Sequence, residues 1–297
     1  MCPNQRDDAV SRKPAGTRPG RPAPARLDLW LVEHGLAPSR EKARALILAG
    51  VVRVDGQRED KPGKPVPVGA SVEVAGSGCP YVSRGGQKLE SAWKRFGFSA
   101  TGKICLDVGA STGGFTDFLL RQGAAKVYAV DVGYGQLAWS LRNDPRVVVR
   151  ERVNARDLRR EQVPEPIELA VVDVAFISLG KVMPAVAPLL GPAGEAVCLV
   201  KPQFEAGPER VGKKGVVRTP EVHEEVLAAV AGQAEAWGLS VRGACFSELR
   251  GPEGNVEFFL YLARQGESLP VDAHGIVEAA WRFFAGGQEG RAEPPQP

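Results

Sequence analysis

The pattern of apolar positions along residues 104–262 predicts a layered α/β fold. Short apolar runs of strand length are separated by segments whose apolar residues recur at helical spacing, and this alternation is typical of a doubly wound sheet. The last two runs read as an antiparallel pair. The predicted strands of this Rossmann-like, seven-stranded mixed sheet with an antiparallel last strand are 104–108, 127–130, 147–149, 170–173, 196–201, 240–246 and 256–262.

The segments between these predicted strands have apolar residues at helical spacing. Apolar residues at 115–120 predict a helix that ends at Gly123, and those at 89–96 predict a helix that packs on the sheet. We expect a longer helix at 221–237 and a terminal helix around 275–285. Residues 203–219, with three glycines and several charged residues, predict a long loop that could fold over a substrate.

Residues 26–74 have the pattern of a separate, small α+β module. Two short helices are predicted, the second running from 40 to 49 behind Ser39 as its N-cap. The alternating run 51–54 predicts a strand, Asp55-Gly56 a tight turn, and 71–74 a further strand. The predicted division of the chain is a disordered basic tail at 1–25, this module at 26–74, a linker at 75–80, the sheet domain at 81–266, and a C-terminal helix with a disordered tail at 267–297.

Composition narrows the class of protein further. The 297 residues carry a net charge of +3, which is too small by itself to indicate a nucleic-acid-binding protein. The five cysteines form no C-x-x-C pair and the three histidines lie far apart, so we expect no metal site and no disulfide framework. No apolar run has the length of a membrane span, and the N-terminus has no signal-peptide pattern, so we expect a cytoplasmic protein without membrane contact. Nothing in the sequence specifies an oligomeric state, and a monomer is the default.

The glycine-rich loop after the first strand of the sheet is the strongest chemical signal. Its sequence, Gly109-Ala-Ser-Thr-Gly113-Gly114, lacks the G-x-G-x-x-G spacing by which dinucleotide-binding proteins hold a pyrophosphate. S-adenosylmethionine (SAM) carries an amino-acid end and a sulfonium instead of a phosphate. Asp131 ends the next strand, about twenty residues after the loop, where a carboxylate can accept hydrogen bonds from both ribose hydroxyls. We therefore predict a SAM site.

The residues predicted to bind SAM lie at the ends of neighbouring strands. Asn154 or Asp157 could accept a hydrogen bond from the adenine amino group, although Asp157 could equally cap a helix. The full predicted set is Asp107, Gly109, Ser111, Thr112, Gly113, Gly114, Phe115, Asp131, Val132, Asn154, Asp157 and Asp173.

A second group of charged residues converges on the same edge of the sheet. Asp173 and Lys201 end two predicted strands, and Glu257 stands at the start of the antiparallel last strand. Such a set suits methyl transfer to a ribose 2′-hydroxyl, a weak nucleophile that needs a base or an orienting acceptor. Lys201 could be the base only when neutral, with Lys88 as a nearby second cation, or it could merely orient the hydroxyl. By its own local sequence, however, Lys88 reads as a surface lysine.

Residues 26–74 resemble the S4 RNA-binding domain. The resemblance rests on Arg26-Leu27-Asp28, Gly35-Leu36, Ser39-Arg40, Ala43-Arg44, Ile47, Gly50 and Val52-Arg53-Val54-Asp55-Gly56. It implies RNA binding, which charge alone leaves undecided because a solvated helix face would look the same. The predicted RNA-binding residues, including three outside this module, are Arg26, Arg40, Lys42, Arg44, Arg53, Arg84, Lys213 and Lys214.

The chain from 26 to about 265 resembles the TlyA or hemolysin A family of ribosomal RNA 2′-O-methyltransferases. The motifs that carry the resemblance start at Tyr81, Leu106, Val130, Asp173, Val200 and Gly254. The family joins an S4 domain to an FtsJ/RrmJ-like methyltransferase, and its catalytic Lys-Asp-Lys-Glu tetrad falls on Lys88, Asp173, Lys201 and Glu257, which reverses the surface interpretation of Lys88. The resemblance implies SAM as cofactor and cytidine riboses of 16S or 23S RNA in ribosomal subunits as substrate.

Two other functions remain as alternatives. The family name suggests a membrane-active hemolysin, although the sequence contains neither a spanning helix nor a strongly amphipathic cationic helix. The second alternative is a non-catalytic RNA-binding factor in ribosome assembly. Base methylation is less favoured than ribose methylation, because enzymes that methylate nitrogen or carbon do not need the lysine pair.

Overall fold

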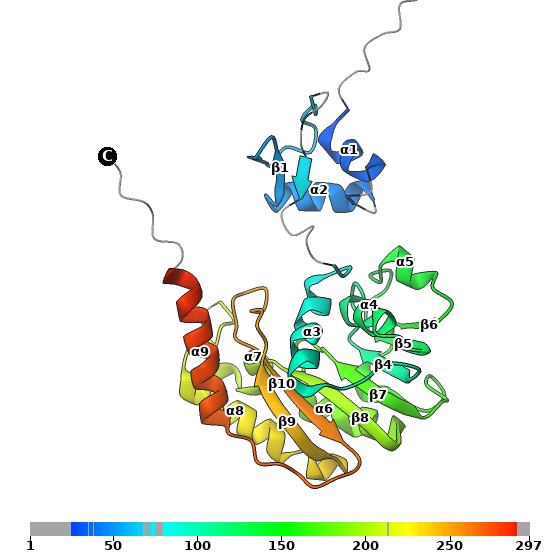
Figure 1. The fold of residues 1–297 in the computed structure, drawn as a ribbon, viewed down its shortest axis with the longest axis vertical. Helices are drawn as coiled ribbons and strands as arrows, with labels where there is room; N and C mark the ends of the chain where they lie inside the picture. The colour runs from blue at the N-terminus through cyan, green and yellow to red at the C-terminus, as the bar shows by residue number, and fades with distance from the viewer. Residues whose placement is uncertain are drawn as a thin grey trace, which may run out of the picture. The chain divides into compact units, whose positions relative to one another are not determined.

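The computed structural model describes residues 25–34, 36–37, 39–67, 70, 72–74, 80–212 and 214–289. The chain divides into two compact units at the boundary between Gly78 and Cys79. Figure 1 shows the fold of each unit. The predicted basic tail up to residue 24, most of the predicted linker, the tail from residue 290 and Lys213 lie outside the described residues.

The N-terminal unit packs two helices on a small sheet. The helices are α1 (Leu27–Glu33) and α2 (Arg40–Leu48), and the Oγ of Ser39 accepts the N-cap hydrogen bond from the Lys42 N–H at 3.2 Å. The antiparallel sheet has the order β2-β1-β3, formed by β1 (Val52–Val54), β2 (Gln57–Glu59) and β3 (Val72–Val74).

The tight turn at Asp55-Gly56 is confirmed, and both residues have positive φ, as a two-residue hairpin of this type requires. The strand that follows it, β2, was not predicted, because Gln57-Arg58-Glu59 offers no apolar alternation to recognise.

The larger unit contains a seven-stranded sheet with the order β6-β5-β4-β7-β8-β10-β9. Its first five strands are parallel, and β10 runs antiparallel between β8 and β9, which confirms the predicted fold class. The strands are β4 (Ile104–Val108), β5 (Lys126–Asp131), β6 (Val147–Glu151), β7 (Ile167–Val172), β8 (Leu190–Val200), β9 (Ser240–Phe246) and β10 (Phe258–Ala263).

Helices of the larger unit connect and cover these strands (Figure 1). The α-helices are α3 (Arg84–Phe96), α4 (Gly114–Arg121), α5 (Trp139–Arg142), α6 (Leu179–Val186), α7 (Pro202–Glu205), α8 (Pro220–Gly232) and α9 (Ala273–Glu289). Short 3₁₀ turns are η1 (Ala155–Asp157), η2 (Ala187–Leu189), η3 (Pro208–Arg210) and η4 (Glu235–Trp237).

Several predicted element bounds were wrong, among them that of the strand expected from 196, which begins at Leu190. The helix expected at 221–237 ends at Gly232 and is followed by η4, since the chain turns before entering β9. The strand expected from 256 begins at Phe258, so Glu257 stands just before it. The expected loop 203–219 begins with α7 and η3, where Pro202 and Pro208 occupy first helical positions.

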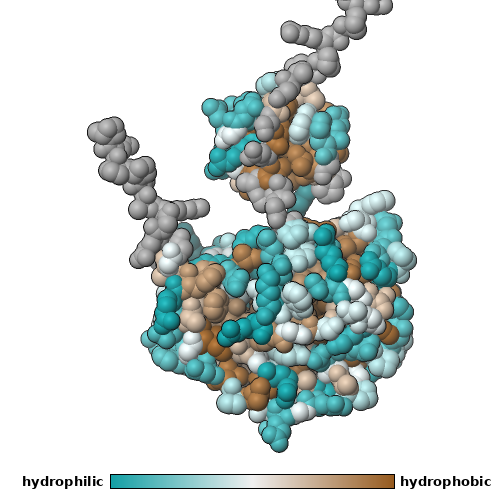
Figure 2. All heavy atoms as spheres, in the orientation of Figure 1, coloured by the Kyte–Doolittle hydropathy of each residue, from teal (hydrophilic) through white to brown (hydrophobic). Residues whose placement is uncertain are grey.

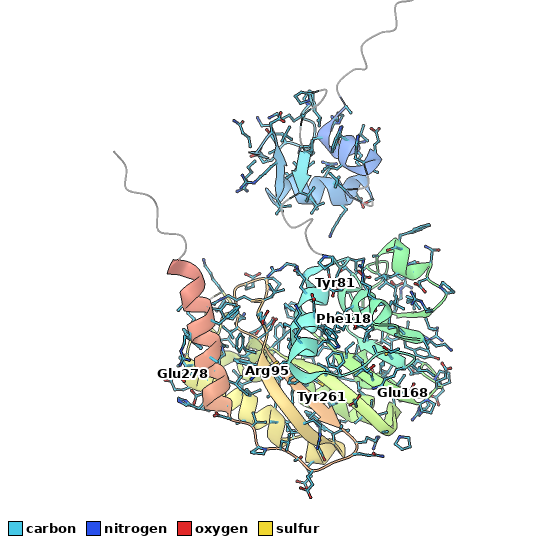
Figure 3. All side chains as sticks on the ribbon, in the orientation of Figure 1. Tyr81, Arg95, Phe118, Glu168, Tyr261 and Glu278 are labelled. Atoms are coloured by element: carbon cyan, nitrogen blue, oxygen red, sulfur yellow. The ribbon has the colours of Figure 1, made fainter. Side chains whose placement is uncertain are left out.

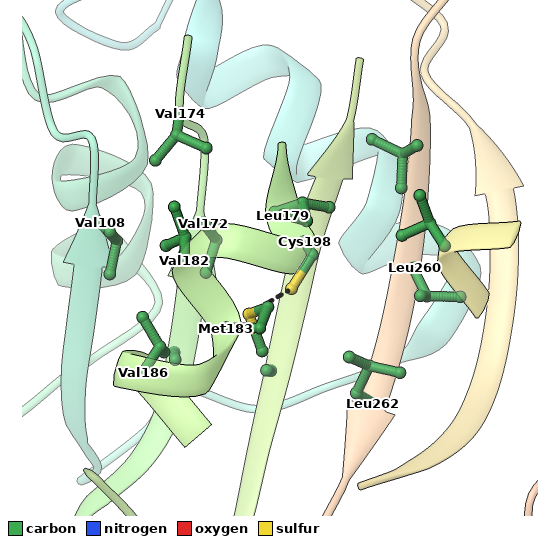
Figure 4. Close-up of a cluster of buried hydrophobic side chains, with 14 of the residues drawn as sticks. Val108, Val172, Val174, Leu179, Val182, Met183, Val186, Cys198, Leu260 and Leu262 are labelled. Atoms are coloured by element: carbon green, nitrogen blue, oxygen red, sulfur yellow. Dashed lines mark hydrogen bonds between the residues drawn. The ribbon is translucent and has the colours of Figure 1, made fainter. Parts of the chain in front are cut away.

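Alternating residues of the central strands supply two separate cores. Leu169, Val171 and Val197 face α3 and α4 on one side of the sheet. Ala170, Val172 and Cys198 face α6 and α8 on the other. Figure 4 shows part of this second core, where the Cys198 Sγ–H donates to Met183 Sδ at 3.6 Å. A strand buried on both faces reads as a continuous apolar run, which is why the sequence pattern located these strands.

The outer surface of the larger unit carries both hydrophobic and hydrophilic side chains. On the face drawn in Figure 2, hydrophobic side chains are broken up by hydrophilic ones. Phe118, Phe258 and Phe259 are fully buried, while Val132, Trp139 and Phe176 are among the large apolar residues that remain exposed. Val132 and Phe176 belong to the candidate site.

Candidate active site

The glycine-rich loop between β4 and α4 forms the floor of the candidate site. Gly109 has a φ of 86°, and a Cβ atom there would lie 2.3 Å from the carbonyl oxygen of Asp173. Only glycine therefore allows the loop to pass so close to the end of β7. Ser111 also has positive φ, and its backbone N–H donates to Asp131 Oδ2 at 2.8 Å. The loop is thereby tied to the ends of two neighbouring strands.

Asp107 lies in β4, two residues before Gly109 of this loop. It is fully buried, and its Oδ2 accepts a hydrogen bond from the Thr116 hydroxyl at 2.7 Å. Burial raises the pKa of Asp107 to about 7, opposed by the Thr116 hydrogen bond and reinforced by the negative charge of Asp173. The structure thus gives Asp107 a contact that holds α4 to β4, and Thr116 is a partner that the sequence pattern did not reveal.

A cavity of about 420 Å³ opens beside the ends of β5, β6 and β7. Both carboxylate oxygens of Asp131 accept backbone hydrogen bonds, Oδ1 from Gly133 at 2.6 Å and Oδ2 from Ser111. A carboxylate has about four acceptor positions, so Asp131 keeps capacity for two hydroxyl groups. Six of the predicted SAM-binding residues line this cavity, namely Gly109, Ser111, Asp131, Val132, Asn154 and Asp173.

Asn154 and Asp157, the two candidate partners of the adenine amino group, occupy different positions. Asn154 lines the cavity, and its Oδ1 accepts from the Arg156 N–H at 3.1 Å, so it caps η1. Asp157 lies within η1 and not at its N-cap, so the helix cap predicted for Asp157 was wrong. The two residues are close in sequence, and only the path of the chain after β6 separates their roles.

A second cavity, of about 350 Å³, adjoins the first. Gly109, Ser111 and Asp173 line both cavities. The second cavity also contains Thr112, Gly114 and Phe115 of the predicted SAM-binding set, together with Arg84, Lys88, Arg250 and Pro252. Gly113 and Asp107 line neither. Asp173 is therefore the residue of the predicted tetrad that faces both spaces.

The start of α3 is brought to this site by close packing on α4. The Val82 N–H donates to Asp117 Oδ2 at 2.8 Å, and a Cβ on Gly114 would lie 2.8 Å from the backbone nitrogen of Gly86. Figure 3 shows Tyr81 and Phe118 near each other at this contact, with ring centroids 5.8 Å apart. The first turn of α3 therefore lies against the glycine-rich loop, with Lys88 on its inner side.

Two ion pairs form the charged centre of the site. Lys88 Nζ lies 2.5 Å from Glu257 Oε2, and Lys201 Nζ lies 2.5 Å from Asp173 Oδ1. The Lys88 side chain is 9% exposed and that of Glu257 is 1% exposed. The local interpretation of Lys88 as a surface lysine was therefore wrong, because its partner stands 169 residues further along the chain.

An exposed aromatic residue in the segment after β7 was not recognised in the sequence. Phe176 follows Asp173, is 90% exposed and has a φ of 62°, which is rare for a bulky residue. Its ring lies 5.1 Å from that of Phe204, whose ring in turn lies 5.9 Å from Lys201 Nζ. An apolar residue after a strand ordinarily indicates a core position, so the sequence offered no signal for this exposure.

Glu205, the last residue of α7, is half-buried. Its Oε1 accepts from the backbone N–H of Leu179, the first residue of α6, at 2.7 Å. Burial raises the pKa of Glu205 to about 7, and the Leu179 hydrogen bond opposes this. Glu205 thereby links α7, which follows Lys201, to the helix that follows Phe176.

The predicted RNA-binding residues of the N-terminal unit fall into two groups. Arg26 and Arg40 both donate to the buried Asp28, at 3.0 and 2.9 Å, while each guanidinium stays about half exposed. The Arg26 hydrogen bond is the main cause that lowers the pKa of Asp28 to about 2. Lys42 and Arg44 are exposed on α2, and Arg53 donates to the Gly56 carbonyl at 3.0 Å.

The remaining predicted RNA-binding residues belong to the larger unit. Arg84 donates to the carbonyl of Arg250 at 3.1 Å and lines the second cavity. Lys214 is exposed in the loop after η3.

Metal sites and membrane spans are two further classes of feature relevant to function. Within the described ranges, no group of three or more His, Cys, Asp or Glu side chains is placed to hold a metal ion. Of the helices in the part of the chain that the structure describes, none combines the length and apolarity needed to cross a membrane.

Comparison with known proteins assigns both parts of the chain. Residues 25–72 match the S4 domain family, and residues 81–264 match the FtsJ-like methyltransferase family. The chain is 48% identical over 264 residues to the 16S/23S rRNA (cytidine-2′-O)-methyltransferase TlyA of Mycobacterium tuberculosis, an alignment that covers 89% of this chain and 98% of TlyA.

Two further relatives extend this similarity. Hemolysin A of Brachyspira hyodysenteriae is 41% identical over 237 residues, which is 80% of this chain and 98% of that protein. A solved structure from Streptococcus thermophilus, provisionally named a hemolysin, is 41% identical with a TM-score of 0.72 and covers 89% of this chain and 98% of that one. The chain therefore belongs to the TlyA and hemolysin A family, in which an S4 domain precedes an FtsJ-like methyltransferase domain.

Proposed function

We propose that the protein transfers a methyl group from SAM to the 2′-hydroxyl of a cytidine in ribosomal RNA. The observation that carries this proposal is the pair of ion pairs, Lys88 with Glu257 and Lys201 with Asp173, beside the glycine-rich loop. The nature of the substrate comes from the TlyA relative, whose name specifies cytidine riboses of 16S and 23S RNA.

The first cavity is the proposed seat of SAM. Asp131 is held by two backbone N–H groups in a position to accept the ribose hydroxyls, and Asn154 is the candidate partner for the adenine end. The glycine-rich loop admits the amino-acid end, with Ser111, Thr112, Gly113, Gly114 and Phe115 as candidate contacts. When bound, SAM supplies the electrophilic methyl group.

Asp107 and Asp157 are proposed to support this seat indirectly. Asp107 fixes α4 through Thr116, and Asp157 belongs to the short turn that Asn154 caps. Neither lines the cavity.

The tetrad is proposed to handle the hydroxyl group. Asp173 lines both cavities and pairs with the Lys201 ammonium, so a hydroxyl that binds beside Asp173 would be within reach of Lys201. Lys201 either accepts the hydroxyl proton or orients the oxygen by donating to it while a carboxylate accepts the proton. Glu257 holds Lys88 as a second cation that stabilises the developing negative charge on the oxygen.

RNA recognition is proposed to involve both parts of the chain. Residues 26–74 bind structured RNA through the Arg26 and Arg40 pair with Lys42, Arg44 and Arg53, while residues 81–266 carry the reaction. The target nucleotide leaves its stack, and the exposed Phe176 ring offers its base a stacking partner. Arg84 and the Lys213-Lys214 pair then contact phosphates. Ribosomal subunits as substrate imply action in the cytoplasm, and we treat the enzyme as a monomer.

Substitution of Lys201 tests the proposal. Lys201→Ala should keep SAM binding in calorimetry and lose methyl transfer to ribosomal subunits by about 10² to 10⁴-fold, the usual contribution of a positioned proton acceptor. Lys181→Ala, an exposed lysine on α6, serves as the control and should keep wild-type turnover. Wild-type turnover of Lys201→Ala would contradict the assignment.

The pH dependence of a second variant separates the two roles of Lys201. Lys201→Arg keeps a donor but cannot become neutral near pH 7. If Lys201 only orients the hydroxyl, Lys201→Arg should retain part of the activity, whereas a proton acceptor should lose it at every pH tested.

Mapping of RNA from a deletion strain separates the enzyme from a non-catalytic assembly factor. The proposal expects a 2′-O-methyl group to be missing at a cytidine, and complementation should restore it. An assembly factor would leave the methylation pattern of the strain unchanged.

A further inference from the structure

The segment 247–257, between β9 and β10, connects the C-terminal helix to the candidate active site. Its Arg250 and Pro252 line the second cavity, and it ends at Glu257 of the tetrad. In Figure 1 this loop stands between α9 and α3. The Arg250 carbonyl accepts a hydrogen bond from Arg84, which joins the segment to α3. The Ser247 N–H donates to the Glu257 carbonyl at 2.8 Å, which holds the two ends of the segment together.

Internal hydrogen bonds give the segment one conformation. The Gly251 N–H donates to the Asn255 carbonyl at 2.9 Å, and the Gly254 N–H returns to the Gly251 carbonyl at 2.9 Å. Arg250 Nη1 donates to the Gly254 carbonyl at 2.9 Å. The guanidinium of Arg250 therefore spans the turn that lies over Glu257.

The turn also presses directly on the tetrad. A Cβ on Gly251 would lie 2.5 Å from Glu257 Oε1, so the backbone of the turn is one side of the pocket that holds this carboxylate. Glu257 is 1% exposed and its other oxygen bonds Lys88. A shift of the turn would consequently move Glu257, and with it the Lys88 ammonium.

The far side of the Arg250 guanidinium rests on α9. Its Cζ lies 4.4 Å from the centroid of the Phe284 ring, a distance at which a cation and an aromatic face attract each other. The helix itself is anchored by the fully buried Val277 and Ala280 and by a hydrogen bond from Trp281 Nε1 to His223 Nδ1 at 3.4 Å. The helix that carries Phe284 is therefore fixed against the rest of the unit.

We propose that Phe284 is a positioning residue of the methyl transfer, which acts by holding Arg250 and so fixing the 247–257 segment against Glu257 and Lys88. The helix that carries it lies beyond residues 81–264, which match the FtsJ-like family. The inference rests on the proposed function, because its readout is the rate of methyl transfer. A rival role for Arg250 is direct contact with an RNA phosphate, but its guanidinium is already engaged with Gly254 and Phe284.

The test compares three variants of the full chain on ribosomal subunits. Phe284→Leu keeps an apolar side chain but removes the aromatic face, and Phe284→Trp restores it. Phe283→Leu is the matched control. Phe283 is the preceding residue of the same helix and its ring packs on Phe246 and on Phe284, whereas the Arg250 guanidinium lies over the Phe284 ring. The measurements are kcat, KM for the subunits, the dissociation constant of SAM and the melting temperature.

Phe284→Leu is expected to lower kcat about tenfold while KM and SAM affinity stay within about twofold, because small displacements of catalytic groups cost rate more than binding. Phe284→Trp should recover most of kcat, and Phe283→Leu should match the wild type. Three outcomes would overturn the inference: an unchanged kcat in Phe284→Leu, an equal loss in both leucine variants, or a raised KM at constant kcat, which would indicate an RNA contact. Failure of the wild type to methylate the subunits would instead overturn the proposed function.

Discussion

Two ion-pair clusters in this protein use the same side-chain chemistry in opposite surroundings. In the N-terminal unit, a buried Asp28 holds Arg26 and Arg40, whose guanidinium groups remain about half exposed. In the larger unit, Lys88 and Glu257 are both buried. In the proposed function, the exposed guanidinium groups of the first cluster contact RNA, and the buried pair of the second belongs to the catalytic tetrad. The two clusters therefore differ in burial more than in residue type.

Removal of one buried partner should have the largest effect on stability. Glu257→Ala leaves the Lys88 ammonium buried without its partner, and such a change typically costs about 3–5 kcal/mol of unfolding free energy. Denaturant unfolding of the full chain measures this loss. The double variant Lys88→Met with Glu257→Leu should recover most of the stability and none of the activity. An unchanged free energy of unfolding in Glu257→Ala would contradict the expectation that the buried ion pair matters more for stability than the half-exposed one.

Substitution of Asp28 should lower the free energy of unfolding by a smaller amount, which depends on pH. Its folded-state pKa of about 2 lies below the usual value near 3.8, so its contribution is present above pH 4 and disappears as the pH falls towards 2. Because both arginines are half exposed and screened by solvent, we expect Asp28→Asn to cost only about 1 kcal/mol at pH 7.

Unfolding of Asp28→Asn and the wild type at pH 7 and pH 2.5 checks this expectation. The difference between them should shrink at the lower pH. A difference that stays constant with pH would show that the carboxylate charge is not what holds the arginines.

The smallest effect on stability, and a selective effect on RNA affinity, is expected for Arg40→Ala. Loss of one phosphate contact should weaken RNA binding severalfold and reduce the slope of affinity against salt by about 1. Titrations of ribosomal subunits at several salt concentrations measure both quantities. Arg58→Ala, another arginine of the same unit, is the control and should change neither. An equal change in both variants would indicate a general charge effect in place of a docking site.

Local sequence patterns located most of the elements but not their exact ends. The two-face burial of β4, β7 and β8 produces continuous apolar runs, so these strands were predicted. β2 was missed because Gln57, Arg58 and Glu59 are polar, and the helix expected at 221–237 was too long because its last turn is set by the entry into β9. The ends of elements depend on what packs beside them, which a local pattern does not contain.

The sequence by itself determined the fold class and the glycine-rich loop, and through motif resemblance it predicted the four tetrad residues. Tertiary structure alone decided that Lys88 is buried on Glu257, that Asn154 and not Asp157 lines the cavity, that Phe176 is exposed, and that Arg250 lies over Phe284 of α9. The physical reason is that these contacts join residues far apart in the sequence. Periodicity reports the neighbours of a residue along its own element, whereas these contacts join residues brought together by strand order.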